Sequence, residues 1–199
     1  LISTDHAGHV SSDSVLVSVL NAAPVMAAMQ DRSAKEGDSV DVSVAFTDPG
    51  ILDTHTAEVN WGDGVVSNAT VIESGGLGNV TARHAYGDNG LYLARVTVRD
   101  DDGVISSQTF RVTITNASPI LANLPDLSTT EGGFIQLPPG VFTDAGFDNP
   151  AGDTTENFTA AIDWGDGTVE PVEDITVTES PGAEGRPTTG IVQAKHAYG

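Results

Sequence analysis

The strongest constraint on the fold is a pair of short phrases that occur twice, in the same order. The phrase Trp-Gly-Asp-Gly begins at Trp61 and again at Trp164, and the phrase His-Ala-Tyr-Gly begins at His84 and again at His196. The first spacing is 23 residues and the second is 32. The extra residues lie in a Pro/Gly-rich segment, 180–189, where a surface loop absorbs added length at little cost. A pair of phrases that recurs in order indicates an internal repeat.

Between the phrases, apolar side chains alternate with polar or small ones. Residues 40–46 (Val-Asp-Val-Ser-Val-Ala-Phe) show this period of two, and so do residues 92–98 and 110–114. Such a period is typical of a strand with one buried face, and no stretch keeps apolar residues at helical spacing over several turns. About seven short strands in a unit of this length predict an all-β protein made of tandem immunoglobulin-like β-sandwiches.

The repeat predicts three units. When Pro24 is aligned with Pro119, an offset of 95 positions, the alignment extends without a gap back to residue 1. Residues 1–22 are therefore expected to be the C-terminal fragment of a preceding repeat. Residues 23–117 are expected to form a complete domain, and residues 118–199 a domain that lacks its last hairpin.

Charge limits the partners that the chain can bind. The sequence has 28 acidic and 8 basic residues, a net charge of −20 at pH 7. This argues against nucleic acid and against an anionic membrane surface as partners. No apolar run approaches the roughly 18 residues that span a bilayer, so no membrane insertion is expected. There is no cysteine, which removes disulfides as a source of information but does not exclude an extracellular location.

With these residues assembled, the chain resembles tandem PKD domains, the polycystic-kidney-disease repeat with an immunoglobulin-like fold. The resemblance rests on the two repeated phrases, on Gly90-Leu91-Tyr92 and on residues 96–100 (Val-Thr-Val-Arg-Asp), and it covers nearly the whole chain. It implies a non-catalytic extracellular module that works in spacing, adhesion or ligand contact. It also implies a calcium site in some relatives, at the N-terminal end of the sandwich.

Calcium is the one ligand for which the acidic loops argue, because Ca²⁺ takes six to eight oxygens from carboxylates, carbonyls and Asn side chains. In a seven-strand sandwich, the loop after the second strand and the loop of the last hairpin lie at the same end as the incoming linker. The candidate ligands of the complete domain are Asn21, Asp48, Asp53, Asp100 and Asp102. Those of the third unit are Asn116, Asp144 and Asp148. The alternative is that Asp-Pro-Gly and Asp-Asp-Gly are turn sequences that need no ion.

Two glutamates, Glu36 and Glu131, are expected at the opposite end of their units, near the next linker. Glu36 could there share an ion with Asn116 and Asp144. An exposed turn glutamate is the simpler interpretation.

The repeated aromatic residues are interpreted as scaffold. Trp61 and Trp164 are expected to anchor the core, and Tyr86 and Tyr198 to donate a hydrogen bond to a nearby backbone group. The histidines of the phrases are expected to pack beside these tyrosines, because no Ser or Cys nucleophile motif accompanies them. Catalysis is not expected.

The sequence as a whole predicts a non-catalytic structural or adhesive segment, such as a stalk, fibre or spacer, of a large extracellular or cell-surface protein secreted by a bacterium. The alternative is a substrate-binding accessory module of a secreted hydrolase, which the low aromatic content of 6% disfavours. The expected partners are neighbouring repeats of the same chain and an extracellular polymer or surface ligand. Other copies could contribute a missing strand by strand addition. The start at Leu1 rather than Met suggests a segment of a longer polypeptide.

Overall fold

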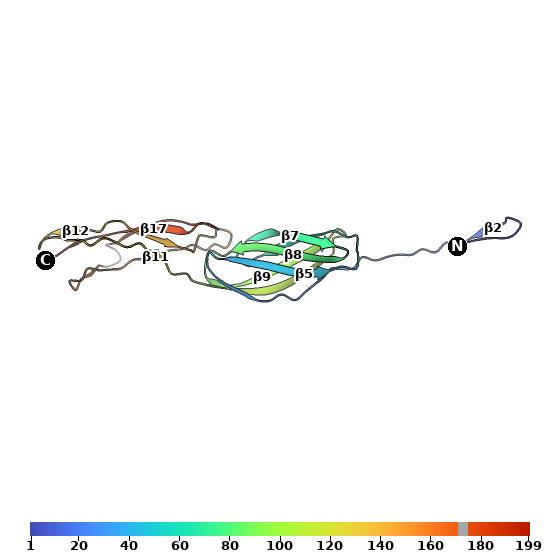
Figure 1. Ribbon diagram of the computed structural model, residues 1–199, viewed down its shortest axis with the longest axis horizontal. Coiled ribbons are helices and arrows are strands. Elements are labelled where there is room, and N and C mark those ends of the chain that lie inside the picture. Colours follow the sequence, from blue (N-terminus) through green and yellow to red (C-terminus); the bar gives the residue numbers. More distant parts are fainter. Residues whose placement is uncertain (171–174) are drawn as a thin grey trace.

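The structure of the protein is a computed structural model that describes residues 1–170 and 175–199. Figure 1 shows three parts along the long axis: a small N-terminal hairpin, a central β-sandwich and a C-terminal unit. The described residues form strands, turns and loops, and none of them belongs to a helix that could cross a membrane. The prediction of an all-β immunoglobulin-like fold is confirmed.

The N-terminal hairpin consists of β1 (Ile2–Thr4) and β2 (Val10–Ser12), and an extended segment joins it to the sandwich (Figure 1). Within it, Thr4 pairs with Val10. In the last hairpin of the sandwich, Arg99 pairs with Ile105. Each residue of the first pair precedes its counterpart by 95 positions, so the hairpin has the register that the repeat predicts. The domain boundaries themselves stay a prediction.

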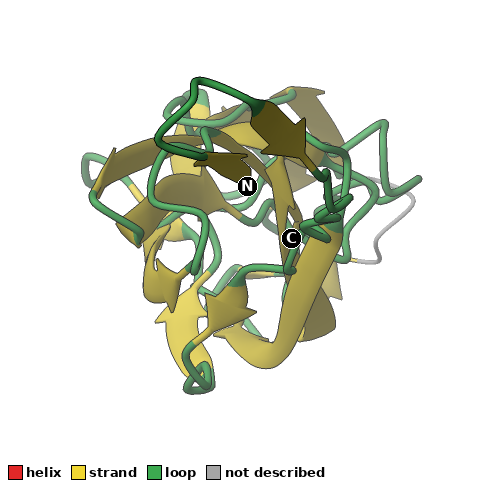
Figure 2. Ribbon diagram, turned by 90° about the vertical axis from the view of Figure 1, so that its right-hand side faces the viewer, coloured by secondary structure: helices red, strands yellow, loops and turns green. Residues whose placement is uncertain are grey.

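The central sandwich is an eight-stranded sheet folded over on itself, with the strand order β3-β5-β8-β7-β6-β9-β10-β4. The strand β7 joins the two layers, because its residues 66–69 pair with β6 in one layer and its residues 70–74 pair with β8 in the other. Figure 2 looks along the long axis and shows the strands curling around the core. The strands are β3 (Val25–Met26), β4 (Arg32–Lys35), β5 (Ser39–Thr47), β6 (His55–Asn60), β7 (Val66–Ser74), β8 (Leu77–Ala85), β9 (Gly90–Asp100) and β10 (Ile105–Thr115).

Alternation along these strands fills the space between the two layers. Every second residue of β5, from Val40 to Phe46, is buried, and the residues between them face solvent. Trp61 and Tyr86 are fully buried, which confirms Trp61 as a core anchor. Each fully buried apolar side chain stabilises the fold by about 1.5–3 kcal/mol, so this core holds the layers together without a disulfide. The rest of the core comes largely from β8, β9 and β10: Val80, Ala94, Val96, Val98, Phe110, Val112 and Ile114.

The C-terminal unit is built from smaller sheets. A four-stranded sheet has the order β11-β13-β17-β16, β12 pairs with β18, and β14 pairs with β15. The strands are β11 (Ile120–Leu121), β12 (Phe134–Gln136), β13 (Gly140–Asp144), β14 (Ile162–Asp163), β15 (Val169–Glu170), β16 (Thr176–Ser180), β17 (Thr188–Gln193) and β18 (Lys195–Ala197).

The core of the C-terminal unit is less covered than that of the sandwich. Its buried apolar residues are Phe142, Ile175, Val192 and Ala194. In the central sandwich, β9 and β10 follow the His-Ala-Tyr-Gly phrase and fill much of the core. An apolar cleft of about 200 Å³ lies beside the core, lined in part by Phe142 and Phe158.

Candidate metal sites and the junction between units

The N-terminal end of the central sandwich gathers four of the proposed calcium ligands. Asp48 follows β5 and Asp100 ends β9, and both side chains are buried. Asn21, from the incoming linker, donates from Nδ2 to Asp100 Oδ2 at 2.7 Å. Asp53 lies close enough to the other acids that they raise its pKa, after the larger effect of lost solvation. The linker and the two loops meet at this end of the sandwich.

A histidine that the sequence did not single out lies among these acids. His55 begins β6, and its ring is buried between Glu73, with Nδ1 2.6 Å from Oε2, and Asp48, with Nε2 3.4 Å from Oδ2. The ring also packs on Phe46, with centroids 4.7 Å apart. His55 stands opposite Asp100 in the register of β6 with β9. The pairing of β6 with β9 cannot be derived from the sequence of the chain alone, so the position of His55 among these acids could not be predicted.

The donor set at this end suits calcium chemically, because carboxylate and amide oxygens are the ligands that Ca²⁺ prefers. Several oxygens are already used as hydrogen-bond acceptors: Asp48 Oδ1 accepts from the Gly50 N–H at 2.7 Å, and Asp100 Oδ1 from the Val104 N–H at 2.8 Å. Burial alone would raise the pKa of Asp100, but hydrogen bonds from Asn21 and Val104 hold it below its usual value. Calcium binding at this end stays a prediction.

The fifth proposed ligand of this domain, Asp102, is exposed in the turn between β9 and β10. Asp48 and Asp100 each accept a backbone N–H of their own loop. Asp102, although exposed, lies near enough to Asp53 to contribute to its raised pKa.

The repeated phrases form the same tyrosine bond in both units. The Tyr86 hydroxyl donates to the carbonyl oxygen of Trp61 at 2.9 Å, and the Tyr198 hydroxyl donates to that of Trp164 at 2.9 Å. The predicted hydrogen bond to a backbone group is confirmed. It ties the Gly-Asp-Gly turn to the strand that carries the second phrase.

The histidines of the phrases form a second shared contact. His84 Nε2 lies 2.7 Å from Asp63 Oδ2, and its ring stacks on Trp61 with centroids 5.0 Å apart. His196 and Asp166 repeat the pair at 2.9 Å. Each pair fixes the turn against the aromatic cluster, which agrees with the expectation of a packed histidine.

The Gly-Asp-Gly turn is also the surface on which the C-terminal unit docks. Asn149 donates from Nδ2 to the carbonyl oxygen of Asp63 at 3.0 Å and to its Oδ2 at 3.1 Å. Nearby, the Phe147 N–H donates to the carbonyl oxygen of Gly87 at 2.9 Å. A Cβ on Gly87 would lie 2.2 Å from the carbonyl oxygen of Phe147, so the backbones of the two units meet here without space for a side chain.

A known family matches the central sandwich, its phrases and its N-terminal linker. The family model described as PKD domain matches residues 21–114. This segment is a PKD domain. The resemblance read from the sequence is confirmed for it. PKD domains occur in extracellular or surface proteins and are generally non-catalytic modules.

Solved structures give further similarities, at low identity. The chain is similar to the PKD domain of an M14-like peptidase from a Thermoplasmatales archaeon, with 23% identity, a TM-score of 0.39, and coverage of 48% of this chain and 98% of that one. It is also similar to the GspB Siglec domain, with 22% identity, a TM-score of 0.38, and coverage of 55% of this chain and 64% of that one. No curated protein matches the chain.

The calcium ligands proposed for the third unit shape the loop that docks on the PKD domain. Asp144 Oδ1 accepts a backbone N–H two residues further on at 2.8 Å, and Asp148 Oδ1 accepts the Glu156 N–H at 3.0 Å. Asn116 is exposed in the linker, where its Nδ2 donates to the carbonyl oxygen of Ala117 at 3.2 Å. The structure brings Asp144 and Asp148 to the junction and leaves Asn116 at the surface. Calcium at these residues stays a prediction.

Glu36 corrects one sequence interpretation. It is 1% exposed rather than an exposed turn glutamate, because the linker folds over it. Its Oε1 accepts the Ala117 N–H at 2.7 Å, while its Oε2 is buried without a hydrogen-bond partner. The counterpart Glu131 is exposed, as expected.

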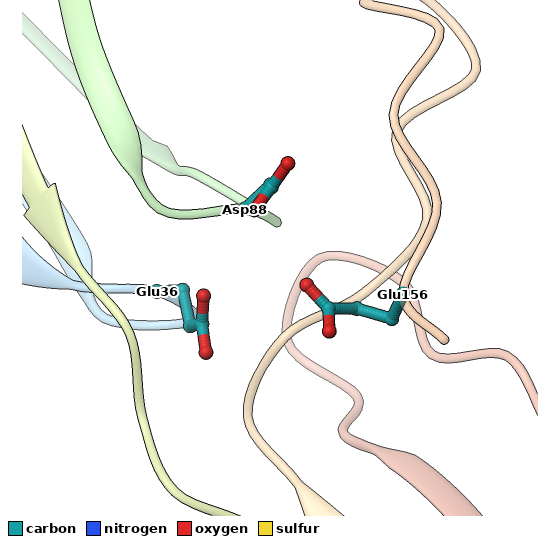
Figure 3. A group of neighbouring side chains, drawn as sticks. All are labelled: Glu36, Asp88 and Glu156. Atoms are coloured by element: carbon teal, nitrogen blue, oxygen red, sulfur yellow. The ribbon is translucent and has the colours of Figure 1, made fainter. Parts of the chain in front are cut away.

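Glu36 faces two acids that the sequence did not single out. Figure 3 shows Glu156, from the C-terminal unit, directed towards Glu36, with Asp88, from the loop between β8 and β9, next to them. One oxygen from each of the three carboxylates lies within 4.8 Å of the others. Within residues 1–170 and 175–199, this is the only group of three or more such side chains that meets so closely.

Burial and crowding change the protonation of this group. Burial first, and then repulsion from Glu36, Asp88, Asp144 and Asp148, raise the pKa of Glu156 to about 7. Burial is also the largest cause of the raised pKa of Glu36. Negative charge at this junction is therefore costly, and a proton or a cation would relieve it.

A difference in loop length gives the only sequence signal for Glu156. Twenty positions separate Asp144 from Trp164, whereas thirteen separate the equivalent Asp48 from Trp61. The additional residues belong to the loop that docks on the PKD domain. Alignment of the repeats shows this insertion, but it does not show which surface the insertion meets.

Proposed function

We propose that the chain is a non-enzymatic spacer segment of an extracellular or cell-surface protein, in which β-sandwich units are held end to end by direct contacts. The observation that carries the proposal is the bond from Asn149 of the C-terminal unit to Asp63 in the repeated turn of the PKD domain. A flexible linker alone would let neighbouring units reorient. A junction with buried hydrogen bonds restricts that motion, which is what a stalk or spacer requires.

Two glycines of the PKD domain permit the close approach. Gly37 and Gly64 have φ angles of 77° and 89°, a conformation that glycine adopts without strain. A Cβ on Gly37 would lie 2.5 Å from the carbonyl oxygen of Ala145, and one on Gly64 2.0 Å from that of Ala151. The turn glycines thus serve both the local backbone and the contact with the next unit.

The C-terminal unit presents the same pair of glycines at its far end. Gly132 and Gly167 have φ angles of 74° and 90°, and a Cβ on either would meet nothing within 4 Å. This equivalence supports a head-to-tail order in which a further unit docks on this end. Neighbouring repeats of the same chain are then the principal partners of the segment.

Two features favour a spacer over the alternatives. Among the strongly exposed large apolar side chains of the described residues, Phe134 is the one aromatic, so the surface offers little for stacking on a polysaccharide. The buried pair of His84 and Asp63 lies under Asn149 at the junction, where a substrate has no access. These features support a structural role over an accessory module of a hydrolase or an enzyme.

The test measures whether the junction is rigid. The sequence has no cysteine, so Thr109→Cys on β10 and Glu179→Cys on β16, both exposed, place a spin label on each unit. We expect a narrow distance distribution by double electron–electron resonance. Gly87→Ala should broaden or shift it, because the three atoms nearest to the new Cβ all belong to Phe147 across the junction.

Gly199→Ala is the matched control, because Gly199 is the repeat equivalent of Gly87 and has open space around it. It should leave the distribution unchanged. A broad distribution in the parent protein, or one indifferent to Gly87→Ala, would contradict a docked spacer.

A further inference from the structure

The carboxylates of Glu36, Asp88 and Glu156 come from three separate elements that meet at the junction. Glu36 lies in the turn between β4 and β5, Asp88 in the loop between β8 and β9, and Glu156 in the docking loop of the C-terminal unit. Figure 3 shows the three side chains close to one another where the two units meet. Their nearest oxygens lie within 4.8 Å of one another.

The buried oxygen of Glu36 gives an independent sign of a missing ligand. Glu36 is 1% exposed, and its Oε1 accepts the Ala117 N–H, while the nearby backbone N–H of Asn89 also acts to lower the pKa of this carboxyl. Its Oε2 has no hydrogen-bond partner. A carboxylate oxygen that is buried without a partner costs free energy, and native structures generally avoid this.

Among the described residues, no ion pair joins a positive side chain to this group. The ion pairs of the described residues involve other acids: Asp5, Asp41, Asp48, Asp63, Glu73 and Asp166. The charged groups that act on Glu156 and Glu36 through space are all acidic, and they raise both pKa values. The junction therefore holds up to three negative charges that the protein itself does not balance.

We propose that Glu36, Asp88 and Glu156 bind one calcium ion that fastens the C-terminal unit to the PKD domain. The donors are all carboxylate oxygens without His or Cys, which selects a hard cation. Ca–O distances of about 2.3–2.6 Å place opposite ligands about 4.6–5.2 Å apart, which accommodates oxygens within 4.8 Å of one another.

The effect of the ion on docking rests on the proposed spacer function, whereas the binding of the ion does not. Two ligands belong to the PKD domain and the third to the next unit, so the ion binds most tightly when the units are docked. Because the ion binds the docked state more tightly than the undocked state, calcium binding stabilises the docked state. Because the loop that carries Glu156 is seven residues longer than the equivalent loop of the PKD domain, the site belongs to this junction and not to every repeat.

The test is a calorimetric titration of the full 199-residue chain with CaCl₂, after treatment with EGTA and dialysis. We expect a binding event at the junction that Glu156→Gln and Glu36→Gln each weaken at least tenfold, separate from any event at the acidic cluster around Asp100. Both substitutions keep the shape of the side chain and remove repulsion, so the variants should fold in EGTA as well as the parent chain does, as thermal unfolding will show.

Two controls separate this site from other acids. Glu58→Gln, exposed on β6, makes the same change of charge away from the junction and should bind as the parent chain does. Asp100→Asn alters the acidic cluster at the other end of the PKD domain and should leave the junction event in place. The proposal would be overturned if Glu156→Gln and Glu36→Gln bound calcium as tightly as the parent chain, or if only Asp100→Asn weakened the binding. So would an absence of calcium binding, which would leave a shared proton as the only relief of the charge.

The spin-label distances tell failure of the ion site from failure of the spacer function. They are measured in EGTA and then in millimolar Ca²⁺. A distribution that narrows on adding Ca²⁺ in the parent chain, but not in Glu156→Gln, supports both. A narrow distribution in EGTA with no calcium binding overturns the ion site and keeps the spacer.

Discussion

Asn149 of the C-terminal unit donates its side-chain amide to the backbone carbonyl oxygen of Asp63 at 3.0 Å, across the junction. Asp63 also holds His84, with its Oδ2 2.7 Å from Nε2. One aspartate therefore belongs both to the internal scaffold of the PKD domain and to the surface that receives the next unit. This double use accounts for a turn phrase that recurs while the loops around it vary in length.

Replacing Asn149 should loosen the junction without unfolding either unit. Asn149→Ala removes both bonds to Asp63 and should raise the hydrogen-exchange rate of the Phe147 amide, which donates to Gly87 across the junction, about tenfold. Asn157→Ala is the control, because Asn157 is exposed in the same loop and its Nδ2 contacts only Thr155. Equal exchange in the two variants would show that the amide of Asn149 does not hold the junction.

The cluster at the N-terminal end of the PKD domain makes a separate calcium prediction. In the Glu156→Gln background, where the junction site is weakened, millimolar Ca²⁺ should raise the melting temperature of the PKD domain by several degrees over EGTA. A ligand at 100 times its Kd stabilises by about 2.7 kcal/mol. Asp100→Asn should abolish the rise, and Asp126→Asn, exposed and remote in sequence, should keep it. A melting temperature indifferent to Ca²⁺ would reduce these acids to turn caps.

The fold followed from the sequence where local pattern and long-range packing agree. The alternation in residues 40–46 became the alternating burial of β5, and the aligned repeats anticipated the register of the hairpin β1–β2. Tyr86 was expected to bond to the backbone and does so, at the carbonyl oxygen of Trp61. Each of these features depends on residues within one unit.

The candidate site followed only in part, because its residues are brought together by contacts that no single unit encodes. Glu36 is buried by the linker, and it meets Asp88 and Glu156 only once the next unit docks. His55 lies among the acids through the pairing of β6 with β9. Acidic loops in a sequence indicate where charge is concentrated, but the partner of each acid depends on tertiary structure.

The shared tyrosine bond permits a paired comparison of stability. Tyr86→Phe removes a hydrogen bond to a buried carbonyl and should lower the free energy of unfolding of the PKD domain by about 1–3 kcal/mol. Tyr198→Phe should cost less in the C-terminal unit, because Tyr198 is only partly buried and water can replace the bond. Urea unfolding followed by fluorescence measures each, with the tryptophan of the other unit replaced by phenylalanine. A larger effect at Tyr198 would contradict this ranking.

Without a cation, the junction should depend on pH through Glu156. Burial, and then repulsion from the acids that face it (Glu36, Asp88, Asp144 and Asp148), raise its pKa in the folded protein to about 7 from the ordinary glutamate value of 4.5. Between about pH 4.5 and pH 7, the folded state therefore keeps a proton on Glu156 that the unfolded state releases. The associated stability is present below about pH 4.5 and is lost as pH rises through about 7.

In EGTA, the urea midpoint of the parent chain should accordingly fall between pH 5.5 and pH 8 by more than that of Glu156→Gln, which cannot ionise at this position. The difference between the two proteins isolates this carboxyl from every other titrating group. Glu58→Gln, whose side chain is exposed on β6, should retain the full slope of the parent chain. Millimolar Ca²⁺ should flatten the slope of the parent chain, because an ion bound by the ionised carboxylates replaces the proton. Parallel slopes in the parent chain and Glu156→Gln would mean that Glu156 is ionised and solvated at neutral pH, and that the junction is open there.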